Sequence, residues 1–395
     1  MATFRTNRPR PSTTKLHYFK TDEFFVYSPY FADFGPLDLG QLFRYCALVN
    51  EKLSSLANEG KAIVHWTTVN PKKRANSAFL IASYAVIELK ATPKDAFRAL
   101  LSSRVPLPPF QDANQANSIY TIRLLDCLNA LNKAFFFRLV DFYDFDVETY
   151  EHYSQVDNGD LNWIVPNKLV AFARPSDDPR DPNGLPPEEY SKYFAAKGVG
   201  TVVRLNKSTY DSRRFVWNGV AHYDLYFPDG TAPNKTILVN FLQICESVPH
   251  AVAVHCKAGL GRTGCLIGAY LVKHYRMTAL EAIAWLRICR PGSVIGHQQS
   301  WLESLETWLH RQGDDYRAWK FGSSDKVAVH RYGIYSVEQP PVSPSSSAVA
   351  LTARQTRDAL YQPSGTYPFW AWYDPGPSSG RSVWEVYGAP LRGWS

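Results

Sequence analysis

The stretch 254–264, VHCKAGLGRTG, contains residue types that can hold and attack an anion. Cys256 follows an apolar run, and Arg262 comes after five further residues, two of which are glycines. A strand, a glycine-containing loop and a helix in this order point backbone N–H groups inward and form an anion cradle at the helix N-terminus. The same field stabilises a thiolate, the nucleophilic form of cysteine. Arg262 has a planar fork that binds two phosphate oxygens, so the stretch predicts cysteine-based chemistry on a phosphate.

The residues around Cys256 fit the same chemistry. The predicted phosphate-binding loop consists of Lys257, Ala258, Gly259, Leu260, Gly261 and Arg262. We expect Thr263 to donate a hydrogen bond to the sulfur, which helps it to leave from a phosphocysteine, and His255 to orient the loop through its ring nitrogens. The competing interpretation, a buried cysteine beside a glycine turn, requires six residues to match by chance, at about 10⁻⁸ per position for average composition.

Composition narrows the class of protein. The chain has 395 residues, of which 45% are apolar and 20% charged, and this excludes a wholly disordered chain, a collagen and a coiled coil. At about 150 residues per domain, this length predicts roughly two to three domains. The 43 Lys and Arg against 36 Asp and Glu give a net charge of +7, which is too mild for nucleic-acid binding and compatible with an anionic substrate.

The cysteines and the lengths of the apolar runs indicate the cellular compartment of the protein. The six cysteines are Cys46, Cys127, Cys245, Cys256, Cys265 and Cys289. No two of them have C-x-x-C spacing, so we expect no zinc site, no other metal and no cofactor. The N-terminus has no apolar signal segment, and no run approaches about 18 apolar residues, so we expect neither secretion nor a membrane span. These features predict a soluble protein in a reducing compartment.

Strand and helix signals alternate in the second half of the chain. Short apolar strands are predicted at 169–173, 200–205, 222–227 and 251–254. Helices are predicted at 186–197, 234–247 and 262–275. Asn234 is the expected N-cap of the second helix, and Gly198 ends the first. This alternation indicates an α/β domain with a mainly parallel sheet, in which Cys256 follows a buried strand.

The chain also contains an internal repeat. Residues 80–101 align without gaps with residues 266–287, with seven identities in 22 positions, and each copy follows a strand that ends in Val-His. The first copy has Trp66 where the second has Cys256, and its connection to the helix is four residues longer. Two amphipathic helices that share apolar positions by chance would explain the helix match but not the repeated Val-His. The repeat therefore predicts two similar domains, of which only the second has the nucleophile.

The loop 255–264, HCKAGLGRTG, resembles the Cys-x5-Arg loop of protein tyrosine phosphatases, in particular of their dual-specificity branch. Further segments resemble, in order, the cell-division-cycle phosphatases that reverse cyclin-dependent phosphorylation at mitotic exit: YFADFGPL (30–37), RANSAFLI (74–81), YEHY (150–153), NGDLNWIVP (158–166), VVRLNK (202–207) and RICRPGSVIG (287–296). This resemblance covers about residues 15–320. It implies an α/β fold of tandem dual-specificity-phosphatase-like domains, each with a mainly parallel central sheet flanked by helices.

With this resemblance the chain divides into five segments. We expect a flexible arm at 1–14, a phosphatase-like domain without the nucleophile at 15–147, an acidic linker at 148–163, the catalytic domain at 164–321 and a disordered, low-complexity tail at 322–395. The tail contains Trp370, Trp372, Trp384 and Trp394, which on an alternative interpretation are short docking motifs.

The reaction needs a general acid that protonates the leaving oxygen. The family's acid lies in the segment that matches YFPDG, which makes Asp229 the candidate, 27 residues before Cys256. Asp224, inside a predicted strand, and Asp211, in a polar loop farther upstream, are the alternatives. Because Asp-Gly is also a common turn pair, Asp229 can be acid and turn residue at once.

The resemblance also implies a glutamine that positions the water for hydrolysis of the phosphocysteine. Gln298 and Gln299 both match this place, and the sequence does not decide between them. A helix-capping or surface role is the alternative for both.

An acidic substrate groove is a further implication of the resemblance. In the family, carboxylates of the linker and the first domain select a basic residue after a phosphoserine-proline. Glu151, Asp160 and Asp112 match these positions. Ser154 departs from the pattern, since relatives carry an acid there, so we expect a weaker preference for the basic residue. A merely solvated linker is the alternative.

The resemblance implies a dual-specificity phosphatase that hydrolyses phosphoserine-proline, phosphothreonine-proline and phosphotyrosine sites through a phosphocysteine. Its partners would be phosphoprotein substrates of proline-directed kinases, with no nucleic acid and no membrane, and its role would lie in mitotic exit, cytokinesis, or the organisation of cilia and microtubules. The implied locations are the nucleus, with the nucleolus as a further candidate, and the cytoplasm, with the spindle pole or centrosome as a further candidate.

Two other functions stay open at this stage. Inositol-lipid phosphatases have a similar loop, but typically carry a lysine where this chain has Leu260, which argues against a multiply phosphorylated headgroup. A scaffold that binds phosphoproteins without turnover is the second alternative, and the intact set of Cys256, Arg262 and Asp229 argues against it.

Overall fold

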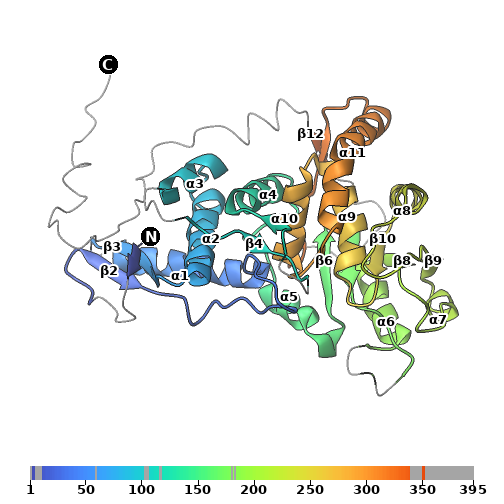
Figure 1. Cartoon of the computed structure of the whole chain (residues 1–395), viewed down its shortest axis with the longest axis horizontal. Coiled ribbons are helices and arrows are strands. Elements are labelled where there is room, and N and C mark those ends of the chain that lie inside the picture. Colours follow the sequence, from blue (N-terminus) through green and yellow to red (C-terminus); the bar gives the residue numbers. More distant parts are fainter. Residues whose placement is uncertain are drawn as a thin grey trace.

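The computed structural model describes residues 2–4, 11–57, 60–101, 106–114, 118–178, 181, 184–338 and 349–351. Figure 1 shows the N-terminal half, in blue to cyan, beside the C-terminal half, in green to orange. Each half contains a sheet flanked by helices, which confirms the predicted α/β class. The four tail tryptophans lie outside the described residues.

The N-terminal half is built on a parallel sheet of three strands in the order β1-β3-β2. β3 (Ala62–Thr68) is central, with β2 (Leu16–Phe19) on one edge and β1 (Ala2–Phe4) on the other. The prediction of a flexible arm is wrong for residues 2–4, because these residues pair with an edge of β3 that would otherwise be open.

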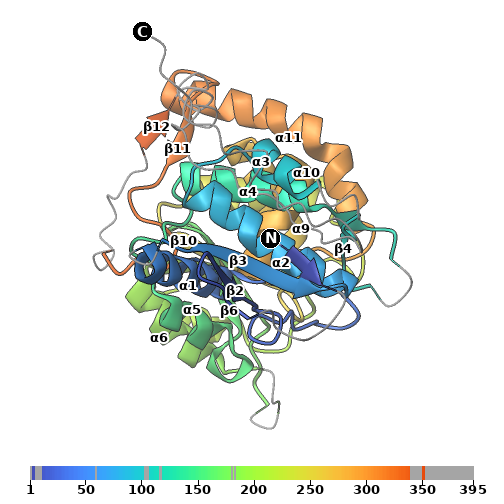
Figure 2. The ribbon, with the colours of Figure 1, turned by 90° about the vertical axis from the view of Figure 1, so that its left-hand side faces the viewer.

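Helices cover both faces of this sheet. They are α1 (Leu39–Ala57), α2 (Pro71–Ile87), α3 (Pro93–Leu101) and α4 (Leu124–Phe136). Figure 2 shows α1 on one side of β2 and β3, and α2, α3 and α4 on the other. A short antiparallel pair, β4 (Phe110–Gln111) with β5 (Thr121–Ile122), stands apart from the sheet.

The segment predicted as an acidic linker, 148–163, is folded. It contains most of α5 (Val147–Ser154), a 3-10 turn (Val156–Asn158) and the start of β6 (Leu161–Val165). The acidic residues mark only the outer side of α5, since Val147 and Tyr150 are buried on its inner side. All residues of β6 are buried because this strand joins the sheet of the catalytic half, which therefore begins before the predicted boundary at 164.

The sheet of the C-terminal half has five strands in the order β6-β7-β10-β8-β9. The further strands are β7 (Leu169–Phe172), β8 (Val199–Arg204), β9 (Ala221–Asp224) and β10 (Ala251–His255). β10 pairs in parallel with β7 and β8, and β8 pairs in parallel with β9, which confirms the mainly parallel sheet. Every residue of β10 is buried, so the strand that leads to Cys256 is held from both faces.

Three helices of this half lie where the sequence pattern predicted them, namely α6 (Pro187–Lys197), α8 (Lys235–Ser247) and α9 (Gly261–Tyr275). The structure adds α7 (Arg213–Trp217), α10 (Ala279–Cys289) and α11 (Gln298–Phe321). The Asn234 side chain accepts a hydrogen bond from the Ile237 N–H at 2.9 Å and caps α8, and Gly198 ends α6 with φ of 68°. Within the described ranges, no helix is long and apolar enough to cross a membrane.

The two halves share one hydrophobic core. Phe79 and Leu131 from the first half and Ile283 and Trp285 from the second belong to the same buried cluster. At its edge, the Lys133 ammonium donates to the Glu281 carboxylate at 2.7 Å, from α4 to α10. The interface between the halves is therefore a packed apolar contact with an ion pair beside it.

Residues 323–338, which we call the clasp, return from the end of α11 to the N-terminal half. The Ile334 N–H donates to the Leu139 carbonyl, and the Asp146 N–H donates to the Tyr335 carbonyl, both at 2.8 Å. The Tyr335 hydroxyl accepts a hydrogen bond from the Trp163 N–H at 3.1 Å. The predicted tail boundary at 322 thus precedes a folded segment, which is anchored by buried Ile334 and Tyr335. Within the clasp, β11 (Val327–Val329) pairs antiparallel with β12 (Val349–Leu351).

Candidate active site

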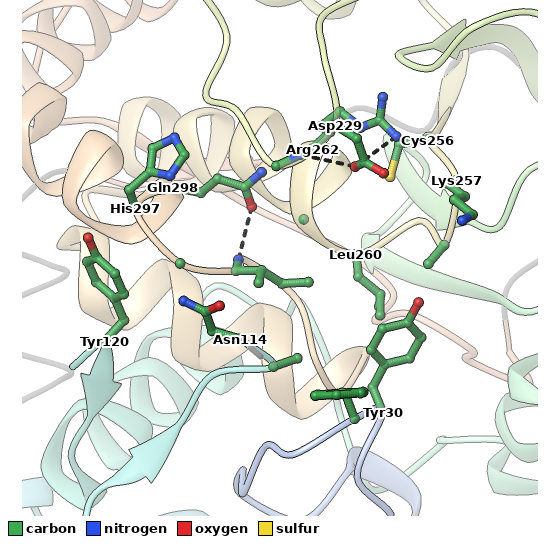
Figure 3. Close-up of a pocket in the computed structure, with 17 residues that line it drawn as sticks. Tyr30, Asn114, Tyr120, Asp229, Cys256, Lys257, Leu260, Arg262, His297 and Gln298 are labelled. Atoms are coloured by element: carbon green, nitrogen blue, oxygen red, sulfur yellow. Dashed lines mark hydrogen bonds and ion pairs between the residues drawn. The ribbon is translucent and has the colours of Figure 1, made fainter. Parts of the chain in front are cut away.

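The cysteine loop lies where the two halves meet. Cys256 directly follows β10, Gly261 begins α9, and the loop between them forms one wall of a cavity of about 760 Å³. The N-terminal half contributes Tyr30, Asn114 and Tyr120 to the opposite wall (Figure 3). The cavity therefore depends on both halves of the chain, although the reactive side chains come from the second.

The backbone of the loop is held with its carbonyls turned outward. Five successive carbonyls, those of residues 256–260, each accept a hydrogen bond from outside the loop. Their donors, in order, are His255 Nδ1, the Arg174 N–H, Arg290 Nη2, Arg290 Nε and the Gly264 N–H, at 2.8 to 3.1 Å. No described peptide bond is cis, so each following N–H points the opposite way, toward the cavity. This arrangement produces the anion cradle that the sequence predicted.

Arg290 is a site residue that the sequence analysis missed. The residue is 3% exposed, and its guanidinium donates to both the Ala258 and Gly259 carbonyls at 2.9 Å. Its Nη1 atom donates to Asp160 at 2.8 Å and to Asn162 at 2.7 Å, which fixes the fork in one orientation. The signal in the sequence is an arginine in an apolar helix end, RICRPG, where an unpaired charge would be costly.

Gly259 meets a steric requirement of the loop. Its φ is 66°, a left-handed conformation that side chains rarely adopt, and a Cβ there would lie 2.1 Å from the Phe172 carbonyl oxygen. Only glycine allows this close approach between the loop and the end of β7.

Arg262 and Asp229 meet at the cavity. Arg262 Nη2 lies 3.0 Å from Asp229 Oδ1, and Arg262 Nη1 donates to the Phe227 carbonyl at 3.1 Å. The Arg262 side chain is 4% exposed, whereas that of Asp229 is 69% exposed. Figure 3 shows Asp229, Arg262 and Cys256 gathered at one end of the cavity. The exposed carboxyl of Asp229 thus lies beside the buried nucleophile Cys256, on the side from which a substrate enters.

The two alternative acids have other partners. Asp224 accepts two hydrogen bonds from the Arg204 guanidinium, at 2.6 and 3.0 Å. Asp211 is bound by Arg213 at the surface, and neither Asp224 nor Asp211 lines the cavity. Of the three aspartates that the sequence offered, the structure brings only Asp229 to the cysteine loop.

His255 and Thr263 support the loop in different ways. Burial lowers the pKa of His255 to about 3, so its ring is neutral when it binds the Cys256 carbonyl. The Thr263 hydroxyl is fully buried and has no hydrogen-bond partner among the described residues. The bond to the sulfur that the sequence predicted is therefore not formed in this structure.

The two glutamines point in different directions. Gln298 lines the cavity, accepts a hydrogen bond from the Ile295 N–H and donates to the Thr231 carbonyl, both at 3.0 Å. Gln299 instead donates to the Thr121 carbonyl on β5 at 3.0 Å. The structure thus brings Gln298, and not Gln299, to the cysteine loop.

Only two of the three predicted groove carboxylates line one cavity. Glu151 and Asp160 both line a second cavity of about 780 Å³, which adjoins the loop at Lys257. Glu151 is bound by Arg44 through two hydrogen bonds of 2.7 and 2.6 Å, and Asp160 is bound by Arg290. Both carboxylates thus already have an arginine partner.

Asp112 lies outside this second cavity. It is 3% exposed and accepts hydrogen bonds from the Gly296 N–H and the Ser118 hydroxyl. In this structure Asp112 therefore fixes the segment before α11. Ser154, where relatives have an acid, donates to the Tyr150 carbonyl and adds no charge to the second cavity.

The matching place in the N-terminal half has no comparable loop. β3 continues past His65, and only residues 69 and 70 separate it from α2. The prediction of a longer connection is wrong, because the extra residues extend the strand and the helix. Trp66 is buried at the position of the nucleophile, and the Asp22 carboxylate accepts hydrogen bonds from the Thr67 hydroxyl and the Thr68 N–H. A carboxylate of the chain itself thus lies at this strand end.

The described residues contain no cluster of three or more histidine, cysteine or acidic side chains that would hold a metal ion. All six cysteines are buried and unpaired. The side chains that line the cavity include the Cys256 thiol, the Arg262 guanidinium and the Asp229 carboxyl.

Two family models match the chain. One, described as "Dual specificity protein phosphatase, N-terminal half", matches residues 1–134, and the other, "Dual specificity phosphatase, catalytic domain", matches residues 229–309. The second match includes Asp229, Cys256 and Arg262.

Curated relatives match most of the chain. Dual specificity protein phosphatase CDC14AB of Danio rerio is 53% identical over 320 residues, which cover 80% of this chain and 52% of the relative. CDC14A of Homo sapiens is 52% identical over 321 residues, covering 80% and 54%. CDC14C of Homo sapiens is 46% identical over 314 residues, covering 79% and 70%. The chain thus spans about half the length of the first two relatives.

Proposed function

The chain belongs to the CDC14 family of dual-specificity protein phosphatases, and from this membership and the geometry of the cysteine loop we propose that it is a cysteine-dependent protein phosphatase. The observation that carries the proposal is the convergence of Cys256, Arg262 and Asp229 on a cavity toward which five successive loop N–H groups point.

In the first step the phosphate of the substrate binds the loop N–H groups and the fork of Arg262. The Cys256 thiolate attacks phosphorus, a P–S bond forms and the P–O bond to the substrate breaks. The leaving oxygen takes the proton of the Asp229 carboxyl, so the substrate departs as an alcohol or phenol and Asp229 stays in the site as a carboxylate. For this step Arg262 exchanges its contact with Asp229 for the phosphate oxygens.

In the second step a water molecule hydrolyses the phosphocysteine. The Asp229 carboxylate accepts a proton from the water, whose oxygen attacks phosphorus while the sulfur leaves as a thiolate. Gln298 lines the cavity and is tied to the Asp229 turn through the Thr231 carbonyl, so it is placed to orient this water. The products are inorganic phosphate and the regenerated thiolate.

For substrates, the proposal extends to phosphoserine-proline, phosphothreonine-proline and phosphotyrosine sites made by proline-directed kinases. It extends to a role in mitotic exit, cytokinesis, or the organisation of cilia and microtubules, in the nucleus or nucleolus, the cytoplasm and the spindle pole. The family membership supports a protein phosphatase with a role in the cell cycle. The substrate sites and the locations are proposals that rest on the sequence resemblance alone. A phosphopeptide panel with matched phosphoserine, phosphothreonine and phosphotyrosine, each with and without the following proline, tests the substrate part, and fluorescence imaging of the tagged chain tests the location.

The central test is Cys256→Ser. A serine hydroxyl is a poor nucleophile without a strong base, so turnover of an aryl phosphate should disappear while the fold and the affinity for phosphate remain. Cys265→Ala, a buried cysteine on α9 that does not line the cavity, is the matched control and should keep the activity. Activity of Cys256→Ser within tenfold of wild type would overturn the proposal. A wild-type chain that binds phosphopeptides but shows no burst of product would be a scaffold instead.

A further inference from the structure

The chain itself contains dipeptides of the kind that proline-directed kinases modify. Three serines or threonines precede a proline, namely Ser28, Thr92 and Ser343, and the last lies outside the described residues. Thr92 caps α3, because its hydroxyl donates to the Asp95 carboxylate at 2.7 Å and accepts from the Asp95 N–H at 3.2 Å, and the proline after it is buried. Ser28 and the proline after it are both exposed. Of the two dipeptides that the structure describes, Ser28-Pro29 is therefore the one that another protein can reach.

The backbone around Ser28 is extended and is held at both ends. Residues 26–29 belong to no helix, strand or turn, and a residue before proline favours extended backbone. The buried Asp33 carboxylate accepts hydrogen bonds from the Tyr27 hydroxyl and from the Phe31 N–H. These two contacts flank Ser28, so its hydroxyl lies on a fixed and exposed stretch that a kinase can bind without unfolding the chain.

Ser28 lies next to the cavities at the cysteine loop. Together with Tyr30 it lines the second cavity, and Tyr30 also lines the cavity that contains Cys256. Figure 3 shows Tyr30 beside Leu260 of the loop. A group added to the Ser28 oxygen would therefore lie at the second cavity, two residues from the wall of the catalytic one.

The formal charges that line the second cavity balance. Three acidic and three basic side chains line it, namely Asp38, Glu151 and Asp160 against Arg174, Lys257 and Arg290. Glu151 and Asp160 are each bound by an arginine, so they attract a further cation only weakly. A phosphate on Ser28 would add a charge of about −1.5 to −2 at pH 7 and three acceptor oxygens, which would make the cavity acidic.

We propose that Ser28 is a phosphorylation site for a proline-directed kinase, and that the phosphate there makes the second cavity select a basic residue of a substrate. The kinase transfers the γ-phosphoryl group of ATP to the Ser28 oxygen: a P–O bond forms, the bond to ADP breaks, and the hydroxyl proton passes to the catalytic base of the kinase. The phosphate then supplies a negative charge that Ser154 does not supply. A modified chain prefers substrates with a lysine downstream of the phosphoserine, and an unmodified chain accepts a wider range. This selectivity rests on the proposed function, whereas the modification does not.

The first experiment maps the modification in the full chain. Cys256→Ser, which lacks the nucleophile that would remove the phosphate again, is incubated with a cyclin-dependent kinase, Mg²⁺ and ATP, and its peptides are analysed by mass spectrometry. Ser28 should be phosphorylated and Thr92 should not, because the Thr92 hydroxyl caps a helix. Pro29→Ala in the same background is the matched control, which should lose the phosphate at Ser28 and keep the labelling of Ser343. A chain without phosphate on Ser28, or with equal labelling of Ser28 and Thr92, would overturn the proposal.

The second experiment measures selectivity through binding, so it needs no turnover. Two phosphoserine-proline peptides, one with lysine and one with alanine downstream, are titrated into Cys256→Ser before and after phosphorylation, and fluorescence anisotropy gives their dissociation constants. Phosphorylation should increase the affinity for the lysine peptide relative to the alanine peptide about three- to fivefold, which is the effect of a partly exposed ion pair. Ser28→Gln in the same background, treated with the same kinase, keeps any phosphate elsewhere and should show the affinity ratio of the unmodified chain. An affinity ratio that phosphorylation leaves unchanged, or changes equally in Ser28→Gln, would refute the role of the phosphate.

The failure of this inference and the failure of the proposed function are distinguishable. A wild-type chain without aryl phosphatase activity, whose Cys256→Ser variant binds neither peptide, would refute the proposed function, and the selectivity would fall with it. The labelling experiment would still decide whether Ser28 is a modification site. Conversely, an active phosphatase in which Ser28 takes no phosphate would refute the inference alone.

Discussion

Arg262 Nη2 lies 3.0 Å from Asp229 Oδ1, so the residue that is to bind the phosphate already holds the residue that is to protonate the leaving group. The same guanidinium donates to the Phe227 carbonyl at 3.1 Å, two residues before Asp229. One arginine therefore ties the helix start at the cysteine loop to the turn with the acid. A bound phosphate competes for this arginine, and its arrival frees the Asp229 carboxyl for the leaving oxygen.

Asp229→Asn should slow phosphoserine peptides far more than an activated aryl phosphate. An alkoxide leaving group needs a proton, whereas a nitrophenolate largely does not, so the loss on the peptide should be about 10²- to 10⁴-fold. Steady-state kinetics on both substrates measure this ratio. Asp211→Asn, at the alternative acid on the surface, is the matched control and should leave both rates unchanged. Equal losses on peptide and aryl phosphate would show that Asp229 is not the acid.

Arg290→Lys should damage the loop although it keeps the charge. A lysine is a point donor and cannot bind the two loop carbonyls, Asp160 and Asn162 at once. Because a hydrogen bond to a charged group contributes about 1.5–3 kcal/mol, the loss of one or more such bonds predicts at least a tenfold fall in kcat/KM for an aryl phosphate. The control is Arg214→Lys, an arginine bound to two carboxylates at the surface. Wild-type activity of Arg290→Lys would contradict the clamping role.

Glu151→Gln and Asp160→Asn should have different effects. Asp160 orients Arg290, so its amide variant should lower activity on every substrate. Glu151 is partly exposed and bound to Arg44, so its variant should reduce only the preference for a peptide with a downstream lysine. An exposed pair contributes about 0.2–1 kcal/mol, which limits that reduction to roughly fivefold. The measurement compares kcat/KM for three substrates: a peptide with lysine downstream of the phosphorylated residue, the same peptide with alanine there, and an aryl phosphate. An equal loss on all three substrates for Glu151→Gln would mean that this carboxylate is structural.

Removal of the clasp should destabilise the whole protein. A chain that ends after Gly322 loses the hydrogen bond that the Ile334 N–H donates, the hydrogen bonds that Tyr335 accepts and the burial of both side chains. Burial of one such side chain contributes about 1.5–3 kcal/mol, so the melting temperature should fall by several degrees. The control ends after Leu351 and keeps both strands of the pair β11–β12. Identical melting curves for the two truncated chains would exclude a stabilising role of the clasp.

Stability should decrease as the pH falls below about 6.5. Burial lowers the pKa of His65 and His255 from 6.5 to about 3, and that of His222, His274 and His330 to about 4. Between these values and 6.5 the unfolded chain binds more protons than the folded one, so each histidine contributes a loss of up to about 1.4 kcal/mol per pH unit. The stabilisation is complete above pH 6.5 and is lost progressively toward pH 3. Thermal unfolding from pH 7.5 to 5 measures the slope, which should become less steep in His330→Asn; an unchanged slope would contradict the assignment for His330.

Local patterns predicted the elements around the nucleophile well. The apolar run 251–254, the glycines of the loop and the following amphipathic helix specify β10, the cradle and α9 because all three signals are local in sequence. Asn234 began α8 and Gly198 ended α6 as expected, for the same reason. The repeat correctly indicated a second, similar half.

Long-range contacts explain what the sequence did not predict. Arg290 binds carbonyls 31 and 32 positions away and a carboxylate 130 positions away, and no spacing rule connects them. The clasp was grouped with the proline-, serine- and glycine-rich residues that follow it, so the composition of the whole segment 322–395 hides its buried side chains Val327, Ile334 and Tyr335. The prediction of a linker at 148–163 failed for a related reason. The charged residues on one side of α5 dominate the composition of this segment, although the other side of the helix is buried.

The path of the clasp has a consequence for biosynthesis. The Ser336 hydroxyl donates to the Asp144 carboxylate across 192 positions of sequence, so the earliest-made half receives some of its contacts from the end of the catalytic half. At roughly 5–20 residues per second, a ribosome needs roughly 10–40 s to cover that distance. During this interval the backbone groups of Leu139 and Asp146 lack their hydrogen-bond partners in the clasp. The apolar surface around them is then exposed to other chains or to chaperones. A chain of this design is therefore expected to complete its fold only after most of it has left the ribosome.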